Sequence, residues 1–258
     1  MFLYAEGKEE TDMNNVVKTG LILTGAGILL IGAAYFLTGG ELTAFNSKGN
    51  EYVAKNYEST SKVDKLIVDE RANGVNIVKG DGDNITIDYF DNPDSPLYKI
   101  EEKDGVLEIS RESTGIFKLI NIDFSKKEMT VSVPKDFTGS VDVDLTSGSL
   151  VADGITAGDI KLENTSGSIK LNNVSSSGDL KVENTSGSIK FEKLKAGGDI
   201  SIENTSGSIK GTIVGKESDY SITTDVTAGS CNLGNTTGGS HKLTAETTAG
   251  SIDISFTE

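Results

Sequence analysis

The stretch ENTSGSIK occurs three times without a change, at Glu163–Lys170, Glu183–Lys190 and Glu203–Lys210. The copies begin 20 residues apart. A catalytic centre needs each of its groups once, whereas a stack of equivalent coils needs the same group in every coil. A fixed period of this length is typical of solenoid proteins.

A shorter signature, Thr-Ser/Ala-Gly-Ser, carries the repeat to the C-terminus of the sequence. Successive signature glycines are 19 to 22 residues apart, and no proline lies between them. These glycines are Gly148, Gly167, Gly187, Gly207, Gly229 and Gly250. The spacing predicts a six-repeat β-solenoid over residues 138–258.

Alternation inside one repeat predicts two short strands and two turns. In residues 158–177, Ile160 and Leu162 share an inward face with Asn164, and Thr165-Ser166-Gly167 forms the bend. One such repeat cannot bury its own apolar face, but each coil can cover the next. We therefore expect an all-β protein, a β-solenoid or parallel β-helix-like stack of 20-residue repeats.

The asparagine before each bend falls on the inward side of the coil. Stacked copies of an asparagine can satisfy their amides from one copy to the next, which predicts a structural ladder. The ladder residues are Asn164, Asn184 and Asn204. Outward acids recur with the same period, which is typical of a solvated face. They are Asp159, Asp179 and Asp199.

The composition excludes several classes of function. Acidic residues number 39 and basic residues 24, for a net charge of −15, and no basic cluster predicts a nucleic-acid partner. The one cysteine, Cys231, excludes an internal disulfide and a cysteine-built zinc site. It stands where other repeats have Ile or Leu, so we expect a small buried side chain. We predict no catalytic residue, no metal and no cofactor, and thus no enzyme.

An uncharged stretch of 22 residues, 19–40, is long enough to cross a bilayer as one helix. The alternative is a cleaved signal peptide, but the apolar stretch is long for a signal. We expect a single-pass transmembrane helix that follows a cytoplasmic tail, residues 1–18. Residues 1–12 are acid-rich and a conventional leader begins at Met13, so we expect translation to start there.

Two further segments separate this helix from the repeats. Residues 41–61 are polar without a clear period and are predicted to be a spacer. Residues 62–137 alternate in short runs and predict a β lead-in. Within it, Lys103-Asp104-Gly105 predicts a hairpin, and Pro134 closes the last strand.

The repeat units, Gly-Asp-Ile-Lys-Leu-x-Asn-Thr-Ser-Gly-Ser-Ile, resemble those of the LiaG-like family of bacterial adhesins with β-strand repeats. The lead-in also resembles that family, at Tyr98-Lys-Ile, Asp104-Gly105 and Val133-Pro134, and the match covers about residues 62–258. The resemblance implies an N-terminal membrane anchor and a setting among envelope-stress signalling genes of Gram-positive bacteria.

Together these patterns predict a structural or interaction role in the bacterial cell envelope. The protein is expected in the cell membrane, as a single-pass protein with its C-terminal domain outside the cytoplasm. Its expected partners are the lipid bilayer, through residues 19–40, and an envelope protein or a wall polymer. Two alternatives remain: a glycan-active β-helix enzyme, and an accessory protein that binds a membrane sensor.

Overall fold

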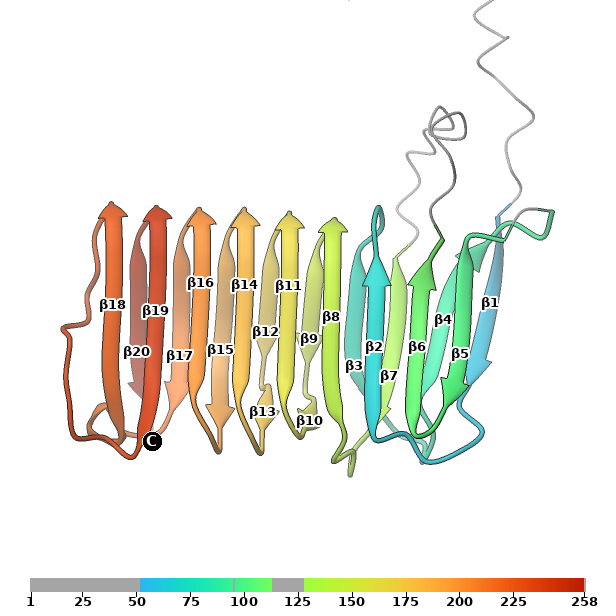
Figure 1. Ribbon diagram of the computed structural model, residues 1–258, viewed down its shortest axis with the longest axis horizontal. Helices are drawn as coiled ribbons and strands as arrows, with labels where there is room; N and C mark the ends of the chain where they lie inside the picture. Colours follow the sequence, from blue (N-terminus) through green and yellow to red (C-terminus); the bar gives the residue numbers. More distant parts are fainter. Residues whose placement is uncertain (1–51, 95, 113–127, 258) are drawn as a thin grey trace, which may run out of the picture. The chain divides into compact units, whose positions relative to one another are not determined.

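The computed structural model describes residues 52–94, 96–112 and 128–257, which form two large sheets that lie face to face (Figure 1). The predicted tail and transmembrane helix, residues 1–40, lie outside the described residues. Within the described ranges, no helix has the length and apolar content that crossing a membrane requires. The prediction of an all-β fold with parallel stacked strands is confirmed.

The front sheet has nine strands in the order β18-β19-β16-β14-β11-β8-β2-β6-β5. Their bounds are β2 Lys65–Glu70, β5 Tyr98–Lys103, β6 Val106–Arg111, β8 Ser140–Ser147, β11 Ile160–Ser166, β14 Leu180–Ser186, β16 Ile200–Ser206, β18 Tyr220–Ala228 and β19 His241–Ala249. All of its pairings are parallel except that of β5 with β6.

The back sheet has eleven strands, and the path β1-β4-β7-β3-β9-β12-β15 continues through β17 to β20. Their bounds are β1 Val53–Glu58, β3 Val75–Gly80, β4 Thr86–Asp91, β7 Met129–Pro134, β9 Leu150–Asp153, β12 Ile169–Asn172, β15 Ile189–Ala196, β17 Ile209–Val214 and β20 Ile252–Thr257. Two short strands, β10 (Thr156–Ala157) and β13 (Ser175–Ser176), lie at the corner of the coil, and one 3-10 turn, η3, spans Glu217–Asp219.

Each coil contains one front strand, a bend and one back strand, as the alternation predicts. Ile160 and Leu162 of β11 and Ile169 of β12 point into the space between the sheets and are at most 1% exposed. Each such side chain contributes roughly 1.5–3 kcal/mol when it is fully buried. The core is therefore a set of aliphatic columns that run along the stack, one residue from each coil.

Glycine at the bend is required by close packing between coils. Gly187 has φ +125°, and a Cβ at this position would lie 2.0 Å from the carbonyl oxygen of Gly167 in the preceding coil. No other residue fits so close to the neighbouring backbone. This contact explains why the Thr-Ser/Ala-Gly-Ser signature recurs.

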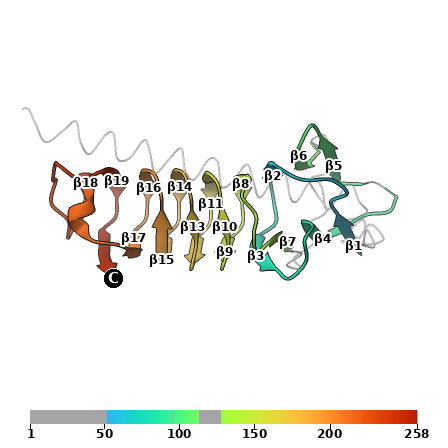
Figure 2. The same cartoon turned by 90° about the horizontal axis from the view of Figure 1, so that it is seen from below.

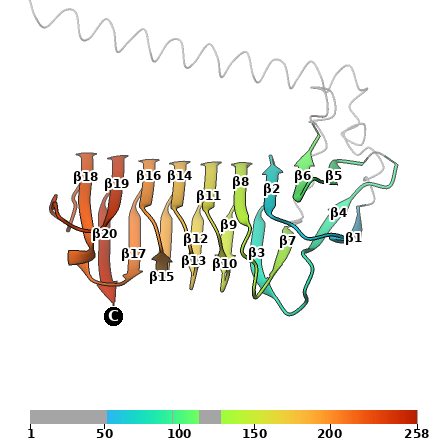
Figure 3. The ribbon, with the colours of Figure 1, turned by 60° about the horizontal axis from the view of Figure 1, so that its bottom comes forward.

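The order of the coils departs from the chain order at both ends of the stack. At the C-terminal end, β18 is outermost, and the later strand β19 lies between β18 and β16 (Figures 1 and 3). At the other end, β6 and β7 lie between the β2–β3 coil and the outer strands β5 and β4. In both cases the chain forms the outermost strand before the coil that this strand covers.

The structure decides three predictions that were made from the sequence. The hairpin at Asp104-Gly105 is confirmed, because β5 and β6 pair antiparallel across two residues with φ +52° and +78°. The spacer prediction is wrong for Val53–Glu58, which pairs with β4 and belongs to the back sheet. Cys231 is only half-buried, because it lies in the outermost coil with no further coil to cover it.

Candidate functional site

A row of carboxylates follows the outer surface of the front sheet, one from each successive strand. Strand register places every member directly beside the next. In their order along the stack, the members of this acid ladder are Asp69, Asp144, Glu163, Glu183, Glu203, Glu246 and Asp225. Neighbouring strands are about 4.8 Å apart, so the carboxylates repel one another along the row.

At Asp144 this repulsion adds to the effect of burial. Partial burial, together with the charges of Glu163 and Asp69 on either side, raises the pKa of the Asp144 carboxyl. Elsewhere lysines offset the repulsion. Lys161 Nζ lies 2.7 Å from Glu163 Oε2, and the hydrogen bond to Glu163 raises the pKa of this lysine.

The lysines cover only part of the acid ladder. Lys181 repeats the arrangement, 2.8 Å from Glu183. In the next coil Ser201 occupies the lysine position and donates a 3.0 Å hydrogen bond to Glu203. Among the described residues, no cation lies within ion-pairing distance of the last three carboxylates, Glu203, Glu246 and Asp225. The C-terminal half of the acid ladder therefore carries uncompensated charge.

A groove of about 460 Å³ runs beside the acid ladder from Asp144 to Asp225. Its floor is the asparagine column, which Thr247 continues in β19, and its far side is formed by one threonine from each of five strands. The threonines are Thr165, Thr185, Thr205, Thr248 and Thr227. The groove is thus a repeated surface, with the same three side chains in its central coils.

The three predicted ladder asparagines are brought into one column at the floor of this groove. Asn164, Asn184 and Asn204 lie in register and are 3–4% exposed. Each Nδ2 donates to a glycine carbonyl of the preceding coil, at distances of 3.1, 3.1 and 2.8 Å. The hydrogen bonds therefore run between coils, but they end on the main chain and not on the next amide.

The outward aspartates that the sequence assigns to a solvated face form a ladder of their own. Asp159 Oδ1 accepts a 2.9 Å hydrogen bond from the backbone N–H of Asp179. Asp179 Oδ1 does the same for Asp199, at 2.8 Å, and Asp199 Oδ1 accepts from Lys242 N–H, at 2.8 Å. These carboxylates join successive coils at the lower corner, so their recurrence has a structural cause.

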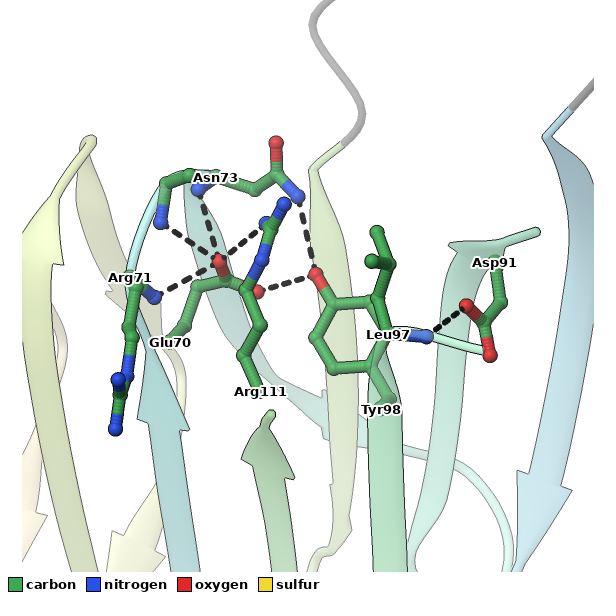
Figure 4. A network of polar contacts seen from close by, with 8 residues as sticks. Glu70, Arg71, Asn73, Asp91, Leu97, Tyr98 and Arg111 are labelled. Carbon is green, nitrogen blue, oxygen red and sulfur yellow. Dashed lines mark hydrogen bonds and ion pairs between the residues drawn. The ribbon is translucent and has the colours of Figure 1, made fainter. Parts of the chain in front are cut away.

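A polar cluster around Glu70 does not repeat, and no pattern in the sequence predicts it (Figure 4). The fully buried carboxylate of Glu70 accepts hydrogen bonds from Arg111 and from the backbone N–H groups of residues 71–73. Tyr98 also donates to it, and burial, with the charge of Glu70, raises the pKa of the Tyr98 hydroxyl. Its members are distant in sequence, so no local motif marks them.

The hydrogen bonds of this cluster join β2, β5 and β6 to one another. Arg111 lies 2.9 Å from Glu70 and packs over the ring of Tyr98, with 5.8 Å from the guanidinium carbon to the ring centroid. Glu70 accepts from five donors, which leaves little capacity to accept a proton from a substrate. Within the described ranges, no three His, Cys, Asp or Glu side chains converge where a metal ion could bind.

Parallel coils joined by side-chain ladders place the protein in the class of solenoid-like all-β proteins. A family model described as Toastrack DUF4097 matches residues 63–258, and the chain belongs to this family. Membership confirms the resemblance to adhesins with β-strand repeats; the LiaG-like and membrane-anchored parts of that resemblance remain predictions. A search of curated proteins found no match.

Several solved structures are similar to this chain. A putative cell adhesion protein from Clostridium sporogenes ATCC 15579 is 16% identical, with 80% of this chain and 100% of that chain covered and a TM-score of 0.47. A putative adhesin from Parabacteroides distasonis ATCC 8503 is 16% identical over 81% and 98%, with a TM-score of 0.35. A putative lipid binding protein from the same organism is 13% identical over 81% and 98%, with a TM-score of 0.32.

Proposed function

We propose that this protein is a membrane-anchored adhesin-like protein that displays its β-repeat stack outside the cytoplasm and has an interaction role in the cell envelope. The observation that carries the proposal is the continuity of the acid ladder and its groove over six strands. A surface that repeats in this way suits a partner that is itself extended or repeated. An anchor at residues 19–40, taken from the sequence, would hold this surface near the lipid.

The alternative of a glycan-active enzyme finds less support. Such an enzyme needs a carboxylate that is free to exchange a proton within a cleft. The carboxylate of the Glu70 cluster, which does not repeat, is fully buried and accepts from five donors. The acids of the groove recur from strand to strand. Their surroundings differ only in that some of them have a lysine partner and others do not.

Photo-crosslinking from the groove in intact cells tests the proposal. A photoreactive amino acid replaces Thr205, which lines the groove, or Asp136, an exposed loop residue, as a matched control position. We expect Thr205, but not Asp136, to capture a wall polymer, in keeping with adhesion. A single reproducible membrane protein captured from Thr205 would support the accessory alternative. Capture of cytoplasmic proteins alone would contradict the proposal.

A further inference from the structure

The outer surface of the back sheet carries a second charged row, and its sign is opposite to that of the acid ladder. Strand register places Lys170 of β12 beside Lys190 of β15, and Lys190 beside Lys210 of β17. All three side chains are exposed. This lysine ladder is a local exception in a chain with a net charge of −15.

The lysine ladder is not neutralised in the way that the lysines of the front sheet are. Lys161 and Lys181 each lie within 2.8 Å of a glutamate two residues along their own strand. Among the described residues, Lys170 and Lys190 have no carboxylate within 4.0 Å, and only Lys210 has a partner, Asp253, at 2.8 Å. Two adjacent ammonium groups are therefore available to a partner.

The two ladders face away from each other. The front-sheet strands form one side of the stack and the back-sheet strands form the other, as Figure 2 shows. Each ladder points outward from its own sheet. An ion pair between the two ladders within one chain is therefore excluded, but an ion pair between two chains is not.

The two ladders also have the same period, because both repeat once per coil. The rise from rung to rung is the spacing of hydrogen-bonded strands, about 4.8 Å, on either face. The unpaired acids Glu203, Glu246 and Asp225 occupy three consecutive strands, as do the three lysines. One displacement of a second copy would thus align every lysine with a carboxylate.

We propose that the lysine ladder of one copy docks along the acid ladder of a second copy, so that stacks associate side by side. The groove beside the acid ladder is long and open, which suits a row of extended lysine side chains. Because the contact joins two different faces, it is heterologous and leaves one free ladder at each end of a pair. The association therefore extends into rows.

Salt dependence follows from the exposure of these charges. Exposed ion pairs are individually weak, and charges are screened beyond about 8 Å at physiological ionic strength. When one displacement of the second copy forms several ion pairs at once, their weak contributions to the free energy of association add together. The association is expected at low salt, or where the chains are crowded, and is expected to weaken steeply as salt rises. A polyanion that occupies the lysine ladder alone is the competing explanation, but it leaves the matching acid ladder unused.

Zero-length carbodiimide crosslinking of the full-length protein in detergent micelles tests the contact, because it joins only amines and carboxylates that touch. We expect covalent dimers and higher rows at low salt, with crosslinked peptides that join a ladder lysine to Glu203, Glu246 or Asp225. Geometry excludes these crosslinks within one chain. High salt is expected to reduce them about tenfold or more. Monomers at every salt concentration would overturn the proposal, as would crosslinked dimers that lack these peptides.

Charge reversal supplies the matched variants. One variant reverses the lysine ladder, and the other reverses the unpaired acids; the substitutions are K170E, K190E and K210E in the first and E203K, E246K and D225K in the second. Each is expected to remain monomeric alone, and an equal mixture of the two is expected to pair. A control with the same charge change elsewhere, K62E, K99E and K135E, should crosslink as the unmodified chain does.

The second variant is expected to fold, since a row of three lysines at this spacing already exists on the back sheet. Neutral versions, with Gln and Asn in place of the charged residues, guard against misfolding of either reversal. They should lose the crosslinks while their melting temperatures stay within a few degrees of the unmodified chain. Undiminished crosslinking in the neutral variants, or dimers of a reversed variant without its counterpart, would overturn the proposal. Added polyphosphate that binds through Lys170 and Lys190 while chains stay monomeric would favour the polyanion.

Discussion

Asn184 shows how one buried side chain joins two coils. Its Nδ2 donates a 3.1 Å hydrogen bond to the Gly167 carbonyl, at 4% exposure. A buried amide that loses such a partner costs about 1–3 kcal/mol, and a buried charge without a partner costs more. The ENTSGSIK repeat therefore depends on an uncharged donor at this position.

Asn184→Asp is expected to destabilise the protein by about 3 kcal/mol at neutral pH. The new carboxylate would meet the Gly167 oxygen without a proton, and burial would raise its pKa above the unfolded value. The folded state would then bind the proton more tightly, so the loss should shrink as pH falls toward 4, the ordinary range for Asp. Denaturant unfolding at neutral pH and near pH 4 measures this loss of stability. Lys181→Ser, which copies Ser201, is the control and should cost about 0–1 kcal/mol; equal losses in both variants would refute the ladder.

At the scale of elements, the back side of the coil takes a left-handed residue just after β9, just after β12 and at the bulge within β15. Gly154, Asn173 and Lys193 occupy this position in three successive coils, with φ of +69°, +50° and +53°. Glycine and asparagine adopt this conformation readily, but for lysine it costs roughly 1 kcal/mol. The Lys193 corner is therefore the strained one.

Lys193→Asn should stabilise the protein by up to about 1 kcal/mol, because asparagine tolerates the left-handed region. The Lys193 backbone N–H donates to Thr212 Oγ1 at 2.9 Å, and the substitution leaves that hydrogen bond intact. Lys195→Asn, in extended backbone nearby, is the control and should bring no gain. The midpoint of denaturant unfolding decides the matter, and a loss of stability in Lys193→Asn would contradict the assigned corner geometry.

A carboxylate also holds the outer edge of the front sheet. Glu102 of β5 accepts hydrogen bonds from the hydroxyl and the backbone N–H of Ser61, from Thr60 and from Tyr57. The Ser61 hydrogen bond, with the others, lowers the pKa of Glu102 to about 2. Residues 57–61 are thereby fastened over an edge strand that would otherwise be open to other chains.

The attachment of residues 57–61 through Glu102 should weaken in acid. Because the folded-state pKa of Glu102 lies below the ordinary value, its stabilising contribution is complete above pH 4.5 and is lost as pH falls toward about 2. The protection factor of the Ser61 amide, which compares its exchange rate with that of an unfolded chain at the same pH, should therefore fall between those values. Glu102→Gln should exchange fast at neutral pH and lose that pH dependence. Slow exchange in this variant would show that the carboxylate does not hold the segment.

At the scale of the whole described stack, the exchanged order of the last coils is the least expected feature. Ser201 lies beside Thr244, and Thr244 lies beside Thr223, so two strand spacings, about 9.6 Å, separate Ser201 from Thr223. A stack built in chain order would instead place Thr223 next to Ser201. The two arrangements bury similar residues, since both repeats carry the Thr-Ala-Gly-Ser signature.

Cysteine pairs distinguish the two orders, in a background that carries Cys231→Ser. Ser201→Cys with Thr244→Cys should form a disulfide, because adjacent strands bring the two Cα atoms within the usual limit of about 7 Å. Ser201→Cys with Thr223→Cys should not, because these residues are two strands apart. Mass spectrometry after mild oxidation gives the answer, and the reverse result would restore the chain order.

Much of the coil could be predicted from the sequence, because periodicity determines which side chains point inward. Ile160, Leu162 and Asn164 share the buried face that their alternation predicts. The order of identical-looking coils could not be predicted, since register within a coil says nothing about which coil is its neighbour. The Glu70 cluster could not be predicted either, because Tyr98 and Arg111 lie 28 and 41 residues after Glu70 in the chain. The opposite charges of the two faces were present in the alternation, which places Glu163 outward on the front strand and Lys170 outward on the back strand.

Protease treatment of intact cells after wall removal tests whether the stack is displayed outside the cytoplasm. Lys18 precedes the predicted membrane segment and Glu41 follows it, a bias that favours a cytoplasmic N-terminus. We expect cleavage between residues 41 and 51 and release of the intact β-domain into the medium. A domain that is cut only after the membrane is broken would contradict the orientation and, with it, the proposed envelope function.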